Sequence, residues 1–426
     1  MTQDHGAGDA QDTPRQREHL SRRGLFAMGA GGLAVGALAG VGGTLAAQAL
    51  THDEQGDSVD AALSYPFYGA GNQSGIRTEP QRHCVYMTFD IDPGTTQTAL
   101  QSLLAVWSAG IAQLMQGKPV GQVQPSRPDA VGQDTGEAVD LGPNALTVTL
   151  GLGPGVFDDR FGLASKKPTL LKHLPALPSD NLQDSLTGGD LSLQACAEDP
   201  QVAYHAIRDL ARIGRGTVST RWTVMGFGRA SAGANQTTPR NLMGFKDGTR
   251  NIRSDEEFRD FVWLDDADWM SGGTYQVARK IQMNVEIWDS DRIGDQQDVF
   301  GRTKTEGAPL SGTTEFDTPD FHKTAHGETV IPQNAHIALA AHENNRGVKI
   351  LRRSYNYTDG INQYGQLDAG LLFIAYMNDP EHFVTLQTKL GSYDRLNEYI
   401  SHIGSAVFAV PPAPETGHYL AEKLFA

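Results

Sequence analysis

Apolar and polar residues alternate, or recur at helical spacing, over most of the chain beyond residue 80. Residues 83–90 (HCVYMTFD) place apolar side chains at every second position, which is typical of a strand with one buried face. Between residues 96 and 115, leucines, Trp107 and Ile111 recur every three or four positions, which predicts an amphipathic helix. The same reasoning predicts strands at 145–151, 217–227, 282–288 and 369–377, and helices at 200–213, 379–390 and 393–403.

These elements mix strands and helices without the regular strand–helix alternation of a parallel sheet, so the pattern predicts an α+β protein. The Pro-, Gly- and Asp-rich stretch 118–143 is expected to be a loop. Polar, glycine-rich residues 50–75 are expected to form a flexible leader. The remainder divides into two α+β halves, residues 76–235 and 236–426.

The first 49 residues have the features of an export signal. Arg22 and Arg23 stand before an uncharged run, residues 25–45, that is rich in Ala, Gly, Leu and Val, and Ala47-Gln48-Ala49 follows it. A twin-arginine start, an apolar centre and a small-x-small end predict a Tat signal peptide over residues 1–49. The alternative is an N-terminal membrane anchor, although so much Gly and Ala makes a poor spanning helix. We therefore expect export to the periplasm, the cell envelope or the extracellular space.

Composition narrows the classes of partner. The formal net charge of −15 argues against nucleic acid, because phosphate binding needs a basic surface. Hydrophobic content of 39% is ordinary for a soluble domain with a real core. The two cysteines, Cys84 and Cys196, are too few for a disulfide scaffold, and they form either one disulfide or two buried thiols.

The segment 239–251 (PRNLMGFKDGTRN) is the first candidate for chemistry. Asp247 follows Gly244 by three residues and directly precedes Gly248. Glycines allow tightly folded backbone that can bring a carboxylate close to a ligand. An ordinary Asp-Gly turn is the alternative explanation.

The segment 330–340 (VIPQNAHIALA) contains one histidine, His336, among mostly apolar residues. Neutral imidazole is the commonest axial ligand of haem iron, and a core histidine with a hydrogen-bond partner is the alternative. His322 and His326 lie in a nearby polar loop and compete for a ligand role.

The segment 348–357 (VKILRRSYNY) ends an apolar strand with Arg352 and Arg353. Neighbouring strand residues point to opposite faces, so we expect one arginine to point inward and the other to meet solvent. An inward guanidinium, which is charged at any pH, indicates an anion or a developing negative charge nearby. A plain surface pair is the alternative.

Together these three segments resemble the dye-decolorizing peroxidases, and in particular their Tat-exported branch, which includes the deferrochelatases of bacterial iron uptake. The likeness covers nearly the whole chain after the signal. Supporting stretches are Thr147–Leu163, Gly188–Tyr204, Phe300–Gly312 and Gln366–Tyr376. The resemblance implies two ferredoxin-like halves, a dimeric ferredoxin-like β-sandwich with peripheral helices, in which the C-terminal half holds most of the haem.

Carried over position by position, the resemblance makes His336 the axial ligand of the iron in one haem b. It makes Asp247 the distal acid, Arg352 the distal arginine and Glu398 the acidic partner of His336. Further residues expected at the cofactor are Gly248, Leu371 and Phe373.

The implied activity is a haem peroxidase that uses hydrogen peroxide to oxidise organic donors such as dyes or porphyrinogens. A deferrochelatase, which removes iron from haem, leaves the porphyrin intact and serves an iron-uptake membrane complex, is the first alternative. A haem-binding carrier without turnover is the second, and an exported structural protein without haem is the third. Asp247 and Arg352 argue against a carrier, because a carrier needs no groups that split peroxide.

Overall fold

The structure is a computed structural model that describes residues 59–426, apart from 231–232, 234–236 and 266–267. The predicted signal peptide therefore lies outside the described residues. Residues 59–426 belong to one compact unit. Within the described ranges, no helix combines the length and the apolar character needed to cross a membrane.

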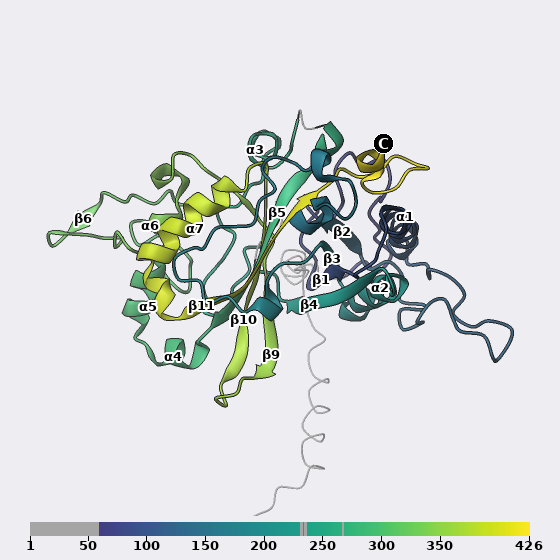
Figure 1. Cartoon of the computed structure of the whole chain (residues 1–426). Coiled ribbons are helices and arrows are strands. Elements are labelled where there is room, and N and C mark those ends of the chain that lie inside the picture. Colours follow the sequence, from purple (N-terminus) through teal and green to yellow (C-terminus); the bar gives the residue numbers. More distant parts are fainter. Residues whose placement is uncertain (1–58, 231–232, 234–236, 266–267) are drawn as a thin grey trace, which may run out of the picture. The chain divides into compact units, whose positions relative to one another are not determined.

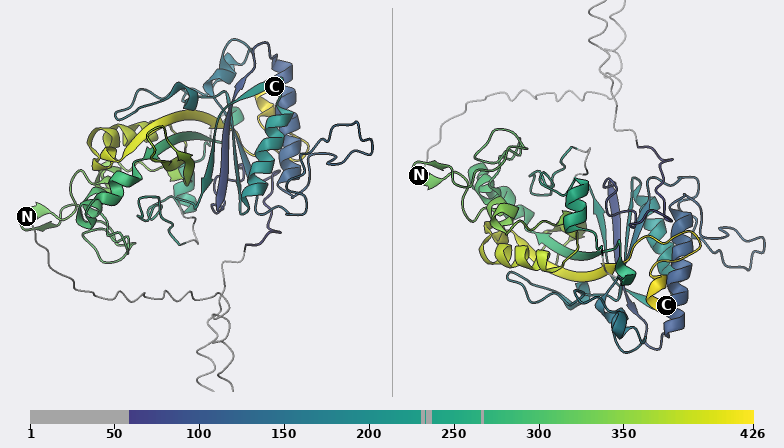
Figure 2. Two further views of the ribbon diagram at one scale, coloured as in Figure 1. Left: turned by 90° about the horizontal axis from the view of Figure 1, so that it is seen from below. Right: turned by 90° about the horizontal axis from the view of Figure 1, so that it is seen from above.

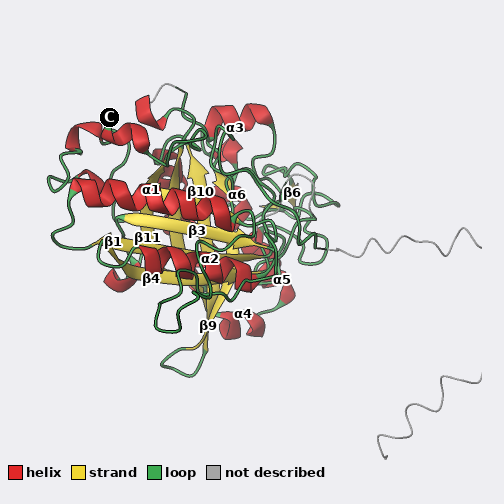
Figure 3. Cartoon of the chain, turned by 90° about the vertical axis from the view of Figure 1, so that its right-hand side faces the viewer, coloured by secondary structure: helices red, strands yellow, loops and turns green. Residues whose placement is uncertain are grey.

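The first half supplies a four-stranded antiparallel sheet, here called the N-terminal sheet, with the strand order β2-β3-β1-β4. Helices α1 and α2 cover its outer face (Figure 3). Asp199 caps the start of α2 by accepting from Gln201 N at 2.7 Å, and Pro200 takes the first helical position. The elements are β1 (His83–Ile91), α1 (Gln97–Leu114), β2 (Thr147–Leu152), β3 (Leu191–Ala197), α2 (Pro200–Ile213) and β4 (Val218–Phe227).

The second half repeats this arrangement as the C-terminal sheet, with the strand order β11-β5-β10-β9 and a short strand β8 beside β10. Its strands are β5 (Thr274–Met283), β8 (Leu351–Arg352), β9 (Tyr355–Ile361), β10 (Leu367–Met377) and β11 (Ile400–Val410). Its helices are α3 (Asp255–Phe261), α4 (Val285–Ser290), α5 (Ile293–Phe300), α6 (His336–Ala340) and α7 (Glu381–Tyr393), and β6 (Thr324–Ala325) with β7 (Glu328–Thr329) forms a separate hairpin. Counted along the chain, the fourth strand of each half lies beside the first, and the third lies between the first and the second. This is the strand order of a ferredoxin-like fold.

The two sheets join at both edges, because β2 pairs with β11 and β4 pairs with β9 (Figure 1). The space between the sheets is filled by a buried core that includes Trp222, Tyr355 and Phe408. A buried hydrogen bond also crosses between the halves, from Tyr376 Oη to Gln194 Oε1 at 2.8 Å. These contacts explain why residues 59–426 form one compact unit and not two separate domains.

Helix α7 lies against the C-terminal sheet, on the far side of the strands from α1 and α2 (Figure 2). Phe383 of α7 packs on Phe373 of β10 with ring centroids 6.0 Å apart. The α+β class expected from the sequence is thus confirmed, and the C-terminal sheet with α6 and α7 encloses the site described below.

Two elements were predicted wrongly. The strand expected at 282–288 is the end of β5, at Met283, followed by helix α4. An apolar run this short cannot be assigned to helix or strand by spacing alone. The helix expected at 393–403 is a 3-10 turn, Arg395–Glu398, followed by strand β11. Most of β11 is buried on both faces, so the apolar–polar alternation that identifies a strand is missing there.

The expected flexible leader is also wrong for residues 59–75, which pack on the rest of the chain; residues 50–58 lie outside the described ranges. Phe67 is buried, and Gly69 N donates to Pro414 O at 2.9 Å. The buried side chain of Gln73 donates to Pro411 O at 2.8 Å and to Leu150 O at 3.1 Å. These distant partners cannot be recognised from local composition.

Candidate active site

A cavity, here called the main cavity, lies between the C-terminal sheet and helices α6 and α7. Its empty space is about 1700 Å³ when the open mouth is included. Residues of β5, β10, β11 and α7 give it apolar walls, among them Ile281, Met283, Leu371, Phe373, Leu386 and Ile400. Leu371 and Phe373 share a face because they are two residues apart on β10.

Asp247 and Arg352 both line the main cavity and form an ion pair, with Arg352 Nη1 2.5 Å from Asp247 Oδ1. Both side chains are partly exposed to the cavity, at 27% for Arg352 and 20% for Asp247. A third residue, Asn251, fixes their separation. Its side chain donates to Arg352 O at 2.7 Å and accepts from Arg352 N at 2.9 Å. The loop that carries Asp247 is therefore tied to strand β8, which carries Arg352.

The backbone around Asp247 has the tight geometry expected from its glycines. Gly248, which also lines the main cavity, has a φ of 102°, a conformation that favours glycine. Residues on both sides of Asp247 are anchored to Glu315, since Lys246 Nζ lies 2.5 Å and Thr249 Oγ1 2.9 Å from its carboxylate. These contacts hold the loop while leaving the Asp247 carboxylate facing the cavity.

His336, the first residue of α6, also lines the main cavity. Its Nδ1 lies 2.6 Å from Asp394 Oδ2, and the Asp394 side chain is only 3% exposed. Asp394 Oδ1 accepts from Leu396 N at 2.9 Å, which orients the carboxylate. Burial lowers the pKa of His336, but the Asp394 carboxylate more than offsets this, so the net shift is upward. With the Nδ1 proton held by Asp394, the lone pair of Nε2 is left for a ligand.

Glu398 was predicted to be the acidic partner of His336, and this is wrong. Glu398 is exposed and does not line the main cavity. It ends the 3-10 turn that Asp394 begins, so the chain turns Asp394 inward and Glu398 outward. The competing histidines, His322 and His326, are exposed and lie outside the main cavity.

The two neighbouring arginines do point to opposite faces, but neither is simply a surface residue. Arg353 is 2% exposed and binds the backbone oxygens of Thr78 and Glu79 and the side chain of Gln81. The expectation that it meets solvent is wrong, because the segment before β1 covers that face.

Two buried arginines at the main cavity could not be anticipated from the sequence. Arg279 is 1% exposed, donates to Ser405 Oγ at 3.0 Å and forms an ion pair with Asp180. Arg302 is 6% exposed and donates to Gly307 O at 2.5 Å and Glu315 O at 3.0 Å. Burial and the neighbouring Arg250 lower the pKa of Arg302 to about 10. Both are guanidinium groups at the cavity, and Asp180 balances the charge of Arg279.

The cysteines are free thiols, and both are buried. Cys84 of β1 and Cys196 of β3 are directly opposite each other in the antiparallel pairing. Neither lines the main cavity.

The fold and the cavity define a class of protein: an α+β enzyme whose apolar cavity holds a carboxylate-supported histidine and a carboxylate–arginine pair. Comparison with known proteins identifies the family. The Dyp-type peroxidase models match residues 73–228 (N-terminal) and 238–415 (C-terminal). The chain therefore belongs to the Dyp-type peroxidases. It is an oxidoreductase that acts on peroxide, in a family that uses haem.

Individual relatives agree. The chain is 37% identical to the deferrochelatase of Yersinia pestis bv. Antiqua (strain Nepal516) over 410 residues, which cover 92% of each protein. It is similar to the solved structure of ferric DtpA from Streptomyces lividans, with 38% identity and a TM-score of 0.79 over 86% of this chain and 98% of that one. A DyP-type peroxidase from Streptomyces coelicolor gives the same identity and TM-score, covering 85% of this chain and 97% of the other.

Proposed function

We propose that the chain binds one haem b in the main cavity and uses hydrogen peroxide to oxidise organic donors such as dyes or porphyrinogens. In this proposal the imidazole of His336 would hold the iron, and Asp247 with Arg352 would act on the peroxide. The observation that carries the proposal is that all three side chains line one apolar cavity.

The residues present suit a haem in several respects. The cavity walls are largely apolar, as the porphyrin ring requires, and Leu371, Phe373 and Gly248 are among them. His336 offers an imidazole nitrogen, and its hydrogen bond to Asp394 is the kind of contact that orients a metal-ligating histidine. The buried cation Arg302 would complement a negative propionate.

Bound haem supplies the redox-active iron at which peroxide reacts. The Asp247 carboxylate would accept a proton from one peroxide oxygen and return it to the departing oxygen, a general acid–base role worth roughly 10²–10⁴ in rate. The Arg352 guanidinium, fixed beside Asp247, would stabilise the negative charge that develops on the departing oxygen. Asn251 acts on neither atom and positions Arg352 through its backbone.

Asp394 has a separate role. By accepting the Nδ1 proton of His336, its carboxylate raises the basicity of the imidazole and fixes the orientation of the ring. A more basic imidazole would be a stronger electron donor to the iron that it holds.

Haem binding by single-residue variants tests the ligand assignment. His336→Ala should lose most of its haem, or should show an altered Soret band without the spectral signature of histidine ligation. His326→Ala is the matched control, since this exposed histidine lies outside the main cavity, and it should bind haem as the wild type does. A normal spectrum in His336→Ala, with loss in His326→Ala, would reassign the ligand.

A second candidate function is the release of iron from haem with the porphyrin left intact. It is supported by the 37% identity to a deferrochelatase over 92% of both chains. In that role the protein would supply iron to a membrane uptake complex. Incubation with haem, with and without peroxide, followed by measurement of free iron and by mass spectrometry of the porphyrin, separates the two activities. Iron-free, intact porphyrin indicates deferrochelation, and donor oxidation without loss of iron indicates a peroxidase.

Export completes the proposal. The paired arginines Arg22 and Arg23 and the apolar run after them support secretion by the Tat route. Because that route carries folded proteins, the chain would receive haem in the cytoplasm and act in the periplasm, the cell envelope or the extracellular space.

A further inference from the structure

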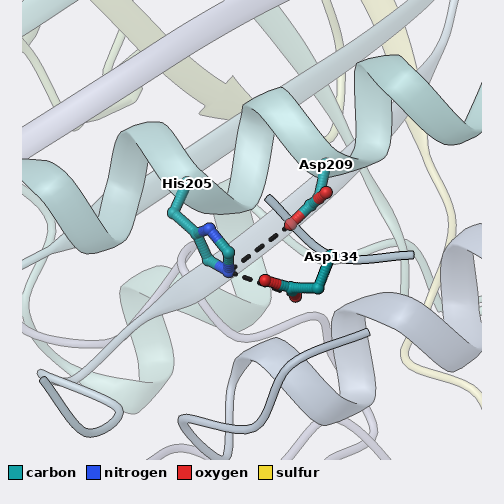
Figure 4. Close-up of side chains that lie close together, drawn as sticks. All are labelled: Asp134, His205 and Asp209. Atoms are coloured by element: carbon teal, nitrogen blue, oxygen red, sulfur yellow. Dashed lines mark ion pairs between the residues drawn. The ribbon is translucent and has the colours of Figure 1, made fainter. Parts of the chain in front are cut away.

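A second group of chemically reactive side chains lies in the N-terminal half. His205 and Asp209 are one turn apart on α2, and Asp134 faces them from the long loop between α1 and β2 (Figure 4). Nε2 of His205 lies 3.5 Å from Asp134 Oδ2 and 3.5 Å from Asp209 Oδ2. The three ligand atoms all lie within 4.8 Å of one another. Both carboxylates have side chains that are 0% exposed, and the imidazole is 6% exposed.

The other ring nitrogen of His205 determines what Nε2 can do. Nδ1 lies 3.2 Å from Glu137 Oε2 and 3.4 Å from Thr135 Oγ1. If Nδ1 carries the proton and faces Thr135 Oγ1 and the Glu137 carboxylate, the Nε2 lone pair faces two carboxylate oxygens. Three electron-rich atoms then converge in a buried place, which is costly unless a positive charge lies among them. A carboxylate behind a histidine is also the usual support of a metal-ligating imidazole.

The distances favour a metal ion over a shared proton as that charge. At 3.5 Å, both Nε2–oxygen separations exceed the 2.7–3.2 Å range of good N–H···O bonds. Around a tetrahedral Zn²⁺ with bonds of about 2.0–2.2 Å, neighbouring ligand atoms lie about 3.3–3.5 Å apart. The spacing of Nε2 from each carboxylate oxygen is therefore the spacing of ligands around one ion.

The carboxylates are also pre-oriented. Asp134 Oδ2 accepts from Val120 N and Oδ1 from Gly136 N, both at 2.8 Å. Asp209 Oδ2 accepts from Thr135 Oγ1 at 3.2 Å. The other oxygen, Oδ1, is fully buried without a hydrogen bond, although Arg212 Nε lies 3.3 Å from it. Two fully buried carboxylates thus present ligand oxygens within 4.8 Å of each other.

We propose that Asp134, His205 and Asp209 bind a divalent transition-metal ion, with zinc as the best match to one imidazole and two carboxylates. None of the three lines the main cavity, so this site is separate from the proposed haem site. The ion would pin the loop between Leu114 and Thr147 to helix α2. This loop is long and contains no helix or strand, so the ion would restrict its conformations in the folded protein.

The metal content of the haem-loaded protein tests the proposal, with a purification tag that contains no histidine. After incubation with Zn²⁺ and removal of the excess, elemental analysis should find about one zinc per chain in the wild type. Asp134→Asn and His205→Gln should each lose it. Glu422→Gln is the matched control, because it disrupts an exposed histidine–carboxylate pair, His418–Glu422, and should keep the zinc. Iron is measured in the same samples and reports the haem separately.

Thermal unfolding of the wild type gives an answer that needs no variant. Zn²⁺ at a hundredfold excess over its Kd should raise the Tm by about 3–5 °C over the EDTA-treated protein. Zinc should also protect the loop between residues 115 and 146 from proteolysis. Equal zinc in all four proteins, or a wild-type Tm and proteolysis pattern that do not respond to EDTA or Zn²⁺, would overturn the proposal. If the variants do not fold, the wild-type measurements decide.

Discussion

Nδ1 of His336 lies 2.6 Å from the nearly fully buried carboxylate of Asp394. Asp394→Asn should keep the hydrogen bond to Leu396 N through its remaining oxygen but remove the charge that makes the imidazole basic. We expect the variant to bind haem, to react with peroxide about 10–100-fold more slowly, and to have a higher iron reduction potential. Stopped-flow mixing with peroxide and a potentiometric titration measure the two effects.

Glu398→Gln is the matched control for Asp394→Asn. It removes an exposed carboxylate four residues away that lies outside the main cavity. Its rate and reduction potential should equal those of the wild type. If Glu398→Gln were impaired and Asp394→Asn were not, the sequence-based assignment would be restored.

Asp394 shows why part of the site could not be predicted from the sequence. It lies 58 residues from His336, and its local sequence shows only the start of a turn. Which of several carboxylates in this region turns inward depends on the 3-10 turn and on the pairing of β11 with β5. Asn251 is similar, because its role exists only once strand β8 lies beside it.

Other features follow from local rules and were predicted well. The alternation of β1 and the spacing of α1 give their bounds to within one residue. The opposite orientations of Arg352 and Arg353 follow from strand geometry alone. The segment that covers Arg353 lies 272–275 residues earlier in the chain. Its contact with Arg353 depends on the tertiary fold and cannot be predicted from the local residue pattern.

Export is expected to depend on the paired arginines. Replacing Arg22 and Arg23 by Lys keeps the charge of the signal but removes the feature that the Tat machinery reads. The variant protein should accumulate in the cytoplasm, as judged by cell fractionation and blotting. Replacing Arg15 and Arg17 by Lys is the matched control and should leave export unchanged. Undiminished export of the Arg22/Arg23 variant would contradict the Tat assignment.

Acid stability should depend on Glu257, which caps helix α3 and bonds Lys349 Nζ at 2.6 Å. Burial raises the pKa of Glu257, but Lys349 and two backbone N–H groups outweigh this and lower it to about 2. Because the pKa of the folded state is depressed, the stabilisation is fully present above the unfolded value of about 4.5 and is lost as the pH falls toward 2. Glu257→Gln should therefore lower the free energy of unfolding by about 1–2 kcal/mol at pH 7, and by much less near pH 3.

Denaturant unfolding of Glu257→Gln at several pH values measures this difference. The neighbouring Glu256 is exposed, so Glu256→Gln should match the wild type at every pH. A destabilisation by Glu257→Gln that is the same at pH 3 and pH 7 would show that the charge of Glu257 is not its source.

The division of labour between Asp247 and Arg352 can be tested by replacing each alone. Asp247→Asn keeps the shape of the loop, since Gly248 retains its φ of 102°, but removes the proton acceptor. Arg352→Leu removes the fixed positive charge and should also change how azide or cyanide binds the ferric iron. Each variant should load haem normally and react with peroxide about 10²–10⁴-fold more slowly.

Asp255→Asn, which removes an exposed carboxylate outside the main cavity, is the control and should react as the wild type does. Stopped-flow mixing over a pH series gives the rates, and wild-type rates in both fully loaded variants would remove Asp247 and Arg352 from the peroxide reaction.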